Sequence, residues 1–259
     1  MPKILITGKK GYIASSLNSS LKEDYEVYAV GRDELDWSNT ADVNQWFKKK
    51  QFDVVIHTAI QGGHRLHNDD VSVLDINLKM YYNLLAHSDK YARFINIGSG
   101  AELFNTNFPY GLSKYVIKQS ITNKENFHNL RVFAVFDENE LPTRFIKANI
   151  LRYINKENMI IFSNKRMDFF YMKDFIKIIR KYIEDNNLPK DISCTYEQTY
   201  YLSEISNFIN TLDSYKVKID IQSDSYGIDY CGNYDNIYVK FDGLFNGIQS
   251  VYEKLSCKK

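Results

Sequence analysis

Cysteine is scarce in this sequence, and its placement speaks against cross-links and metal sites. The chain of 259 residues holds 3 cysteines, Cys194, Cys231 and Cys257, and none of them forms a Cys-x-x-Cys pair. An odd number of cysteines without that spacing argues against a disulfide framework and against a structural zinc site. We therefore expect a reducing, cytoplasmic location and no bound metal.

Excess charge and long apolar runs are also missing. Lys and Arg number 33 and Asp and Glu number 32, so the formal net charge is +1 and does not indicate a nucleic-acid partner. No run approaches the roughly 18 apolar residues that a membrane-spanning helix needs. A predicted strand follows the first residues almost at once, so we expect neither a signal peptide nor a membrane partner.

Short apolar runs alternate with helical segments through the first half of the chain. We predict strands at residues 3–7, 25–30, 53–59, 92–98 and 130–136. Helices are predicted between them at residues 12–22, 36–50, 75–88 and 110–123. Such regular alternation is typical of an α/β protein with a doubly wound parallel sheet, the Rossmann fold.

A glycine turn joins the first predicted strand to the first predicted helix. Residues 8–14, Gly-Lys-Lys-Gly-Tyr-Ile-Ala, have a Gly-x-x-Gly-x-x-Ala pattern in a strand–turn–helix context. The glycines would let the backbone approach a pyrophosphate, which then binds the free N–H groups at the start of the helix. An ordinary βα turn is the alternative.

Three cations lie in this turn and at the end of the second predicted strand. That strand ends in Gly31-Arg32-Asp33, whereas an NAD site usually has an acidic residue at this tip. Arg32, with Lys9 and Lys10 opposite it, suits the 2′-phosphate of NADP(H). The alternative is that Arg32 is a solvated loop residue and Asp33 binds the ribose.

A tyrosine and a lysine four residues apart form a candidate for proton transfer. Tyr110 and Lys114 lie in the helix predicted at 110–123, where positions i and i+4 share a face. An ammonium group lowers the pKa of a neighbouring phenol from its usual value of about 10, which suits a proton donor near neutral pH. Ser99, after the strand at 92–98, would hold a substrate oxygen. An ordinary exposed helix face is the alternative for the Tyr–Lys pair.

Taken in order, the glycine turn, Ser99 and Tyr110-x-x-x-Lys114 resemble the extended short-chain dehydrogenase/reductase family. The resemblance is closest to its NAD-dependent epimerase/dehydratase branch, and there to GDP-L-fucose synthases and nucleotide-sugar 4-keto reductases. Residues 32–36, 53–63 and 75–78 also carry it. The family signature covers about the first 136 residues, and the rest matches loosely through residues 168–174.

The resemblance implies a role for each matched residue. In the catalytic set, Tyr110 would be the general acid, Lys114 would bind the nicotinamide ribose and Ser99 would hold the keto oxygen of the sugar. The NADP(H) contacts would be Gly8, Lys9, Lys10, Gly11, Tyr12, Ile13, Arg32, Asp36, Trp37, Thr58, Ala59, Ile60, Asn77, Ile97, Tyr110, Lys114 and Phe133. The substrate contacts would be Gly63, His64, Ser99, Gly100, Ala101, Arg144 and Arg166. The family also implies a homodimer packed through the helices of Asn77 and Tyr110.

Departures from the family pattern narrow the reaction. The synthases epimerise with a Cys two residues after the serine and a His in the substrate lobe. In this chain the first position is Ala101, and the second falls near residues 143–144, where there is no His. Dehydratases need an Asp-Glu pair directly after the serine, where this chain has Gly100-Ala101. What remains is NADP(H)-dependent reduction of a nucleotide-linked 4-keto-6-deoxysugar without C3/C5 epimerisation. A 4-epimerase that retains its cofactor and a catalytically idle NADP-binding partner protein stay open as alternatives.

Further departures fall in the substrate site. The segment between Ser99 and Tyr110 is short, Ala134 replaces a usual Asn, and Met167 stands where a phosphate-binding Arg is expected, with Arg166 beside it. Residues 62–65, Gly-Gly-His-Arg, could form a loop over the substrate. The sequence therefore predicts an altered sugar-nucleotide site next to an intact cofactor site.

The second half of the chain has a looser pattern. We predict helices at residues 143–155, 173–185, 203–212 and 246–255, and strands at 159–162 and 216–221. We expect an NADP-binding Rossmann domain at residues 1–140 and a smaller C-terminal α+β substrate lobe at 141–259, and leave open that the chain crosses back between them. His57, His64 and His67 lack the carboxylate or Cys spacing of a metal site.

Overall fold

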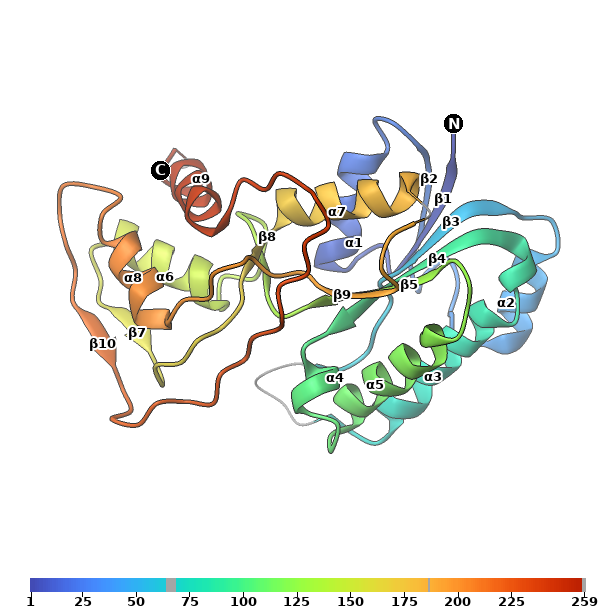
Figure 1. Cartoon of the computed structure of the whole chain (residues 1–259), viewed down its shortest axis with the longest axis horizontal. Coiled ribbons are helices and arrows are strands. Elements are labelled where there is room, and N and C mark those ends of the chain that lie inside the picture. Colours follow the sequence, from blue (N-terminus) through green and yellow to red (C-terminus); the bar gives the residue numbers. More distant parts are fainter. Residues whose placement is uncertain (64–68, 186, 258–259) are drawn as a thin grey trace. The chain divides into compact units, whose positions relative to one another are not determined.

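The computed structural model describes residues 1–63, 69–185 and 187–257 (Figure 1). The chain divides into two compact units. The first consists of Met1–Val132 and Ile178–Ser193, and the second of Phe133–Lys177 and Cys194–Lys259. Each unit is therefore built from two separate segments of the chain.

The first unit alternates strands with helices. Its strands are β1 (Lys3–Thr7), β2 (Glu26–Val30), β3 (Phe52–His57), β4 (Tyr91–Ser99), β5 (Phe127–Val132) and β9 (Asp191–Ser193). Its helices are α1 (Tyr12–Leu21), α2 (Thr40–Phe47), α3 (Ser72–Leu85), α4 (Ala101–Phe104) and α5 (Pro109–Thr122), with a 3-10 helix η1 (Ser88–Lys90). Helix α7 (Met172–Glu184) begins in the second unit and ends in the first.

The described strands of this unit form one parallel sheet in the order β2-β1-β3-β4-β5-β9. The register pairs Ile4 with Val27 on one side and with Val54 on the other. Strands that are covered on both faces read as continuous apolar runs, and Ile4, Leu5 and Ile6 are fully buried. The predicted doubly wound α/β fold is confirmed.

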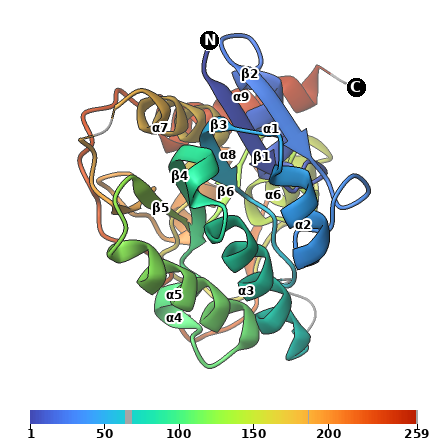
Figure 2. The ribbon, with the colours of Figure 1, turned by 90° about the vertical axis from the view of Figure 1, so that its right-hand side faces the viewer.

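Helices cover both faces of this sheet. On one face α3 and α5 lie side by side (Figure 2), and Tyr81 donates a hydrogen bond to Ser120 Oγ at 2.9 Å. The end of α7 lies beside α1 on the other face, where the Arg180 guanidinium donates to the Ser20 carbonyl at 2.9 Å. Side chains of a strand alternate between the faces, so Leu5 belongs to the core under α2, α3 and α5.

The second unit combines short strands with helices. Its strands are β6 (Val135–Phe136), β7 (Met159–Ile161), β8 (Phe170–Tyr171) and β10 (Ile219–Ile221), and its helices are α6 (Phe145–Ile154), α8 (Leu202–Ile209) and α9 (Leu244–Ser256). β6 pairs with β8 and β7 with β10, each in parallel. Ile150 of α6, Ile205 of α8 and Ile248 of α9 are fully buried in one core. The second unit thus mixes helices and short strands, as predicted for the α+β lobe.

Several predicted element boundaries are wrong. The strand predicted at 130–136 is two strands in different units, because pairing of β5 with β4 ends at Val132. The helix predicted at 36–50 is only α2, because Asn39 Oδ1 accepts the N–H of Ala41 at 3.1 Å and caps the helix there. The elements α4, β8 and β9 are absent from the prediction, since segments this short show no periodicity.

Candidate functional site

The strand order marks one place at the edge of the sheet where ligands bind. The chain leaves β1 toward β2 on one side and then crosses to β3 on the other, so the direction reverses between β1 and β3. Ligands of open parallel sheets bind at the carboxyl ends of the strands at such a switch point. Here these ends lead into the glycine turn, which follows Thr7, and into Thr58 and Ala59, which follow His57.

Gly8 brings these two strand ends into contact. Its φ is +76°, a left-handed conformation that favours glycine, and a Cβ at Gly8 would lie 2.9 Å from the Cα of Ala59. Thr7 Oγ1 accepts the N–H groups of Thr58 at 3.1 Å and of Ala59 at 3.0 Å. Because Thr7 Oγ1 accepts twice, its own hydrogen is donated to His57 Nδ1 at 3.0 Å. The backbone at the switch point is therefore firmly held.

Helix α1 begins in a form that suits a phosphate. Its N-cap is Gly11, which has no side chain to bond the first N–H groups of the helix. Those groups carry partial positive charge and are the usual place for a pyrophosphate. Ala14 is fully buried, so α1 can pack closely on the sheet. The local geometry of residues 8–14 fits the predicted cofactor turn.

Each of the three predicted cations holds a carboxylate in the segment after β2. The ion pairs are Lys9–Glu34 at 2.7 Å, Lys10–Asp33 at 3.3 Å and Arg32–Asp36 at 3.8 Å. The side chains of Lys10 and Arg32 are 76% and 74% exposed, and ion pairs this exposed are weak. A 2′-phosphate would compete with these carboxylates for the cations.

Tyr110 and Lys114 lie together on α5. Lys114 Nζ is 5.9 Å from the centre of the Tyr110 ring and donates to the carbonyl of Ile97 at 2.6 Å. Lys114 is only 5% exposed, so the alternative of an ordinary exposed helix face does not hold for it. Burial lowers the pKa of Lys114 to about 8, and the charge of Glu102 opposes this shift. Because Ile97 precedes Ser99 on β4, the lysine ties α5 to the strand end that carries the predicted serine.

Asn77 joins the segment after β3 to α5. Its Nδ2 donates to the Gln61 carbonyl at 3.0 Å and to Ser113 Oγ at 3.1 Å, and its Oδ1 accepts the Gln61 N–H at 2.9 Å. Ser113 in turn donates to the Tyr110 carbonyl at 2.7 Å. Gly63 has φ +74°, and a Cβ there would lie 2.8 Å from the Tyr110 ring. Gly63 therefore lies against the predicted general acid.

The short segment between Ser99 and Tyr110 folds as α4 and packs on α5. A Cβ at Gly111 would lie 2.1 Å from the carbonyl oxygen of Asn105 and 2.9 Å from that of Ala101, so only glycine permits this approach. Ser99 Oγ accepts the Ala101 N–H at 3.2 Å, which leaves its hydroxyl hydrogen to be donated. Ser99 and Tyr110 are thus held on adjoining elements.

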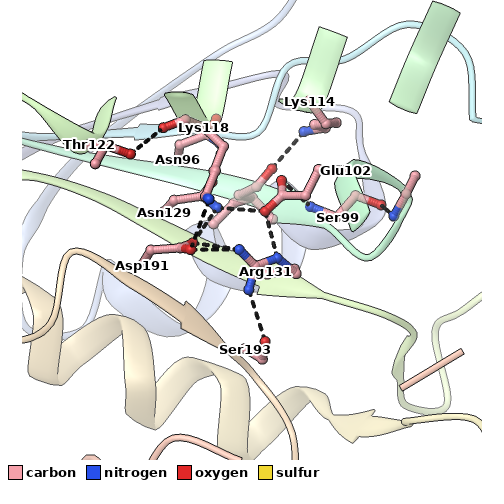
Figure 3. Close-up of polar contacts among 12 residues, drawn as sticks. Asn96, Ser99, Glu102, Lys114, Lys118, Thr122, Asn129, Arg131, Asp191 and Ser193 are labelled. Atoms are coloured by element: carbon pink, nitrogen blue, oxygen red, sulfur yellow. Dashed lines mark hydrogen bonds and ion pairs between the residues drawn. The ribbon is translucent and has the colours of Figure 1, made fainter. Parts of the chain in front are cut away.

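A buried ionic network that the sequence analysis missed lies next to Ser99 (Figure 3). Glu102 of α4 is 1% exposed, and its Oε1 accepts hydrogen bonds from Arg131 Nε at 2.6 Å and Asn129 Nδ2 at 2.9 Å. Its Oε2 accepts the Ser99 N–H at 3.3 Å. The Arg131 guanidinium also reaches Asp191 of β9 at 2.7 Å. The sequence held one sign of this network, because Arg131 lies inside the apolar strand predicted at residues 130–136.

Among the other predicted residues of the first unit, Trp37 is turned into the core. It is 3% exposed, and its ring centroid lies 5.3 Å from that of Trp46, so a cofactor could meet only its backbone. The predicted contact His64 lies outside the described residues. The remaining predicted contacts of this unit lie next to the segments already described. Tyr12 and Ile13 are the first residues of α1, Ile60 follows Ala59, and Gly100 precedes α4.

Three predicted contacts belong to the second unit. Phe133 is 6% exposed. Arg144 precedes α6 and lies 3.9 Å from the buried carboxylate of Glu140. Arg166 pairs with Asp229 at 2.7 Å with its side chain half exposed. Both arginines could bind an anionic group only in competition with these carboxylates.

The histidines do not form a metal site in the part of the chain that the structure describes. His57 is buried, and burial lowers its pKa to about 3, so it is neutral. His64 and His67 lie outside the described residues. Among residues 1–63, 69–185 and 187–257, no group of three His, Cys, Asp or Glu side chains is close enough to hold a metal ion. No helix in these ranges is both long and apolar enough to cross a membrane.

Two cavities lie at the edge of the sheet where β1, β3 and β4 begin, opposite the edge that holds the switch point. One has a volume of about 460 Å³ and is lined in part by Pro2, Asp53 and Arg93. The other has a volume of about 850 Å³, and its lining includes residues 48–50, three consecutive lysines. The amino ends of parallel strands are not where such sheets bind ligands, so we place the candidate site at the opposite edge.

Comparison with known proteins identifies a family and similar folds. Residues 4–194 match the model of the NAD dependent epimerase/dehydratase family. A CDP-abequose synthase from Yersinia pseudotuberculosis is 25% identical over 240 residues, 81% of this chain and 84% of that protein. A GDP-mannoheptose C4 reductase from Campylobacter jejuni with NADP bound has a TM-score of 0.79 at 15% identity, over 98% of both chains. A UDP-glucuronic acid 4-epimerase from Bacillus cereus in complex with NAD has a TM-score of 0.79 at 17% identity, over 99% of this chain and 100% of that one.

Proposed function

Because the chain belongs to the NAD dependent epimerase/dehydratase family, we propose that it is an NADP(H)-dependent reductase of a nucleotide-linked 4-keto-6-deoxysugar. One observation carries the proposal. Tyr110 and Lys114 share α5, and Lys114 is hydrogen-bonded to the end of β4 that carries Ser99. Reduction of a ketone needs a proton donor, a neighbouring cation and a group that holds the oxygen, and these residues supply all three.

The residues of the switch point fit a dinucleotide. Gly8 lets the backbone come close, and the first N–H groups of α1 face the place of a pyrophosphate. Lys10 and Arg32 would meet the 2′-phosphate, which is our reason for proposing NADP(H) over NAD(H). When bound, the reduced nicotinamide would supply the hydride that goes to the keto carbon.

The proton that the reduction adds to the keto oxygen would come from the chain's own side chains. Tyr110 would transfer its phenolic proton to the keto oxygen, while Ser99 would donate a hydrogen bond to the same oxygen and keep its own hydrogen. With a pKa of about 8, Lys114 is charged at neutral pH and stabilises the phenolate that Tyr110 becomes. As pH rises above about 8 the ammonium is lost, and turnover should fall with it.

The small side chains that follow Ser99 argue against dehydration and against C3/C5 epimerisation. Gly100 and Ala101 offer no acid or base for dehydration or C3/C5 epimerisation, and Ala101 is buried. A C4 reductase among the similar structures supports a reaction at that carbon, and a CDP-sugar synthase among the relatives supports a nucleotide-linked substrate.

The test is NADPH oxidation with a panel of nucleotide-linked 4-keto-6-deoxysugars, followed by absorbance. We expect turnover in the wild type, and a loss of about 10²- to 10⁴-fold in Tyr110→Phe, because the variant lacks the general acid. Its NADPH affinity should fall far less than its turnover, since the phenol is a cofactor contact whose main role is in the chemical step.

The matched control is Tyr115→Phe, which removes the same hydroxyl from an exposed position of the same helix. It should turn over like the wild type. Equal activity of Tyr110→Phe and the wild type would contradict the proposal. NADPH binding without oxidation of any panel member would favour a 4-epimerase or an idle binding protein instead.

A further inference from the structure

We propose that Glu102 is a positioning residue that holds the Ser99 backbone and places a negative charge near the Lys114 ammonium at the end of β4, an inference that rests on the proposed function. Glu102 Oε2 accepts the Ser99 N–H at 3.3 Å, and Lys114 Nζ donates to the Ile97 carbonyl at 2.6 Å. These two backbone groups flank Gly98, so the carboxylate and the ammonium bind adjoining peptide units (Figure 3).

Gly98 leaves room for the Glu102 carboxylate against the strand. A Cβ at Gly98 would lie 3.0 Å from Glu102 Oε2 and 2.7 Å from Asn129 Oδ1. Asn129 is itself held, because Asn96 Nδ2 donates to its Oδ1 at 2.7 Å. The carboxylate therefore occupies a built position between β4, β5 and α4.

Arg131 favours the charged form of this buried carboxylate. A carboxylate that is 1% exposed would be costly alone, and burial raises the pKa of Glu102, but the guanidinium of Arg131 at 2.6 Å opposes that rise. The same guanidinium bonds Asp191 at 2.7 Å and Ser193 Oγ at 2.9 Å. The returning segment of the chain thus helps to hold the charge next to Ser99.

The charged groups around Lys114 determine in which direction its pKa should move when Glu102 is replaced. Glu102 is the carboxylate whose charge acts on Lys114, while the His57 ring is neutral and the Tyr110 ring lies 5.9 Å away. Asp191 is neutralised on its other side by Arg131 and by Lys118 at 3.8 Å. Removing the charge of Glu102 should therefore make the Lys114 ammonium lose its proton at lower pH.

The first experiment measures this proton directly in the full-length chain. The rate of acetylation of Lys114 by acetic anhydride is followed against pH by mass spectrometry, because only the neutral amine reacts. We expect a midpoint near pH 8 in the wild type and a midpoint lower by about one pH unit in Glu102→Gln. Glu102→Asp keeps the charge and should stay close to the wild type.

Glu140→Gln is the matched control, since Glu140 is also a buried glutamate but belongs to the second unit. It should leave the Lys114 midpoint unchanged. An unchanged midpoint in Glu102→Gln, or an equal shift in Glu102→Asp, would overturn the proposal. If Glu102→Gln does not fold, Gly98→Ala decides, because its methyl group presses on the Asn129 amide that bonds Glu102 and on Glu102 Oε2 itself, so the carboxylate must move. A lowered midpoint supports the role and an unchanged one overturns it.

A second readout separates positioning from simple stabilisation. In Glu102→Gln the alkaline limb of the pH profile of turnover should move down by the same pH interval as the labelling midpoint. A purely structural role would lower turnover at every pH and leave the limb in place. If the wild type turns over no panel member, the proposed function fails, while the labelling of Lys114 still decides the role of Glu102.

Discussion

At Arg32 the choice of cofactor depends on a competition between charges. The guanidinium is 3.8 Å from Asp36, and Lys9 and Lys10 also hold carboxylates, so the net charge of the cluster is close to zero before a cofactor binds. A 2′-phosphate with two negative charges would have to draw these cations away. Because the existing pairs are exposed, they cost little to break.

Arg32→Ala should therefore weaken NADPH binding by about tenfold, the value of one charge-assisted hydrogen bond, and leave NADH binding unchanged. Titration of the NADPH and NADH fluorescence gives both dissociation constants. Arg152→Ala, on α6 of the second unit, controls for a general loss of positive charge. Equal weakening of both cofactors, or of neither, would show that Arg32 does not recognise the 2′-phosphate.

At the scale of elements, the contact between α4 and α5 sets the spacing of Ser99 and Tyr110. The segment that joins them is short, and it fits because the backbone at Gly111 touches the carbonyl oxygen of Asn105. In an open helix, replacing Gly by Ala stabilises by up to about 1 kcal/mol. Here the added methyl group would have to displace backbone atoms.

We expect Gly111→Ala to lower the free energy of unfolding by about 1–3 kcal/mol, the usual cost of overpacking, instead of raising it. Urea denaturation followed by circular dichroism measures the change. Gln119→Ala, at an exposed position of α5, should stay within about 0.5 kcal/mol of the wild type. A stabilised Gly111→Ala variant would show that α4 does not approach α5 as closely as the structure has it.

At the scale of the whole molecule, the prediction concerns association of two copies of the chain. We predict a homodimer packed through α3 and α5, the helices that carry Asn77 and Tyr110. Each presents a large side chain to solvent in the single chain: Tyr82 of α3 is 46% exposed and Tyr115 of α5 is 40% exposed. Burying such aromatic side chains is a common source of binding energy at interfaces.

Sedimentation equilibrium should give a dimer for the wild type and a monomer for the double variant Tyr82→Glu/Tyr115→Glu, because buried unpaired carboxylates oppose association. Tyr226→Glu makes the same exchange at a tyrosine of the second unit that is 72% exposed, and it should remain a dimer. A monomeric wild type, or equal dissociation of the Tyr226 variant, would rule out this interface.

The sequence by itself determined the features that depend on neighbours along the chain. The parallel strands of the first half, the glycine turn at Gly8 and the shared helix of Tyr110 and Lys114 all follow from local spacing and apolar periodicity. These patterns act over a few residues, so they can be read without knowing what packs against them. The boundaries were less accurate, as the capping of α2 by Asn39 shows.

Only the tertiary structure decided what depends on distant segments. Asp191 joins Arg131 through β9, a strand of three residues from a segment that returns to the first unit, and no local pattern predicts that pairing. The burial of Glu102 beside Ser99 likewise depends on Asn129 and Arg131 of β5, which lie 27 and 29 residues further along the chain. A charged side chain reads as exposed until its partner is known, because the free energy of burying it is set by that partner.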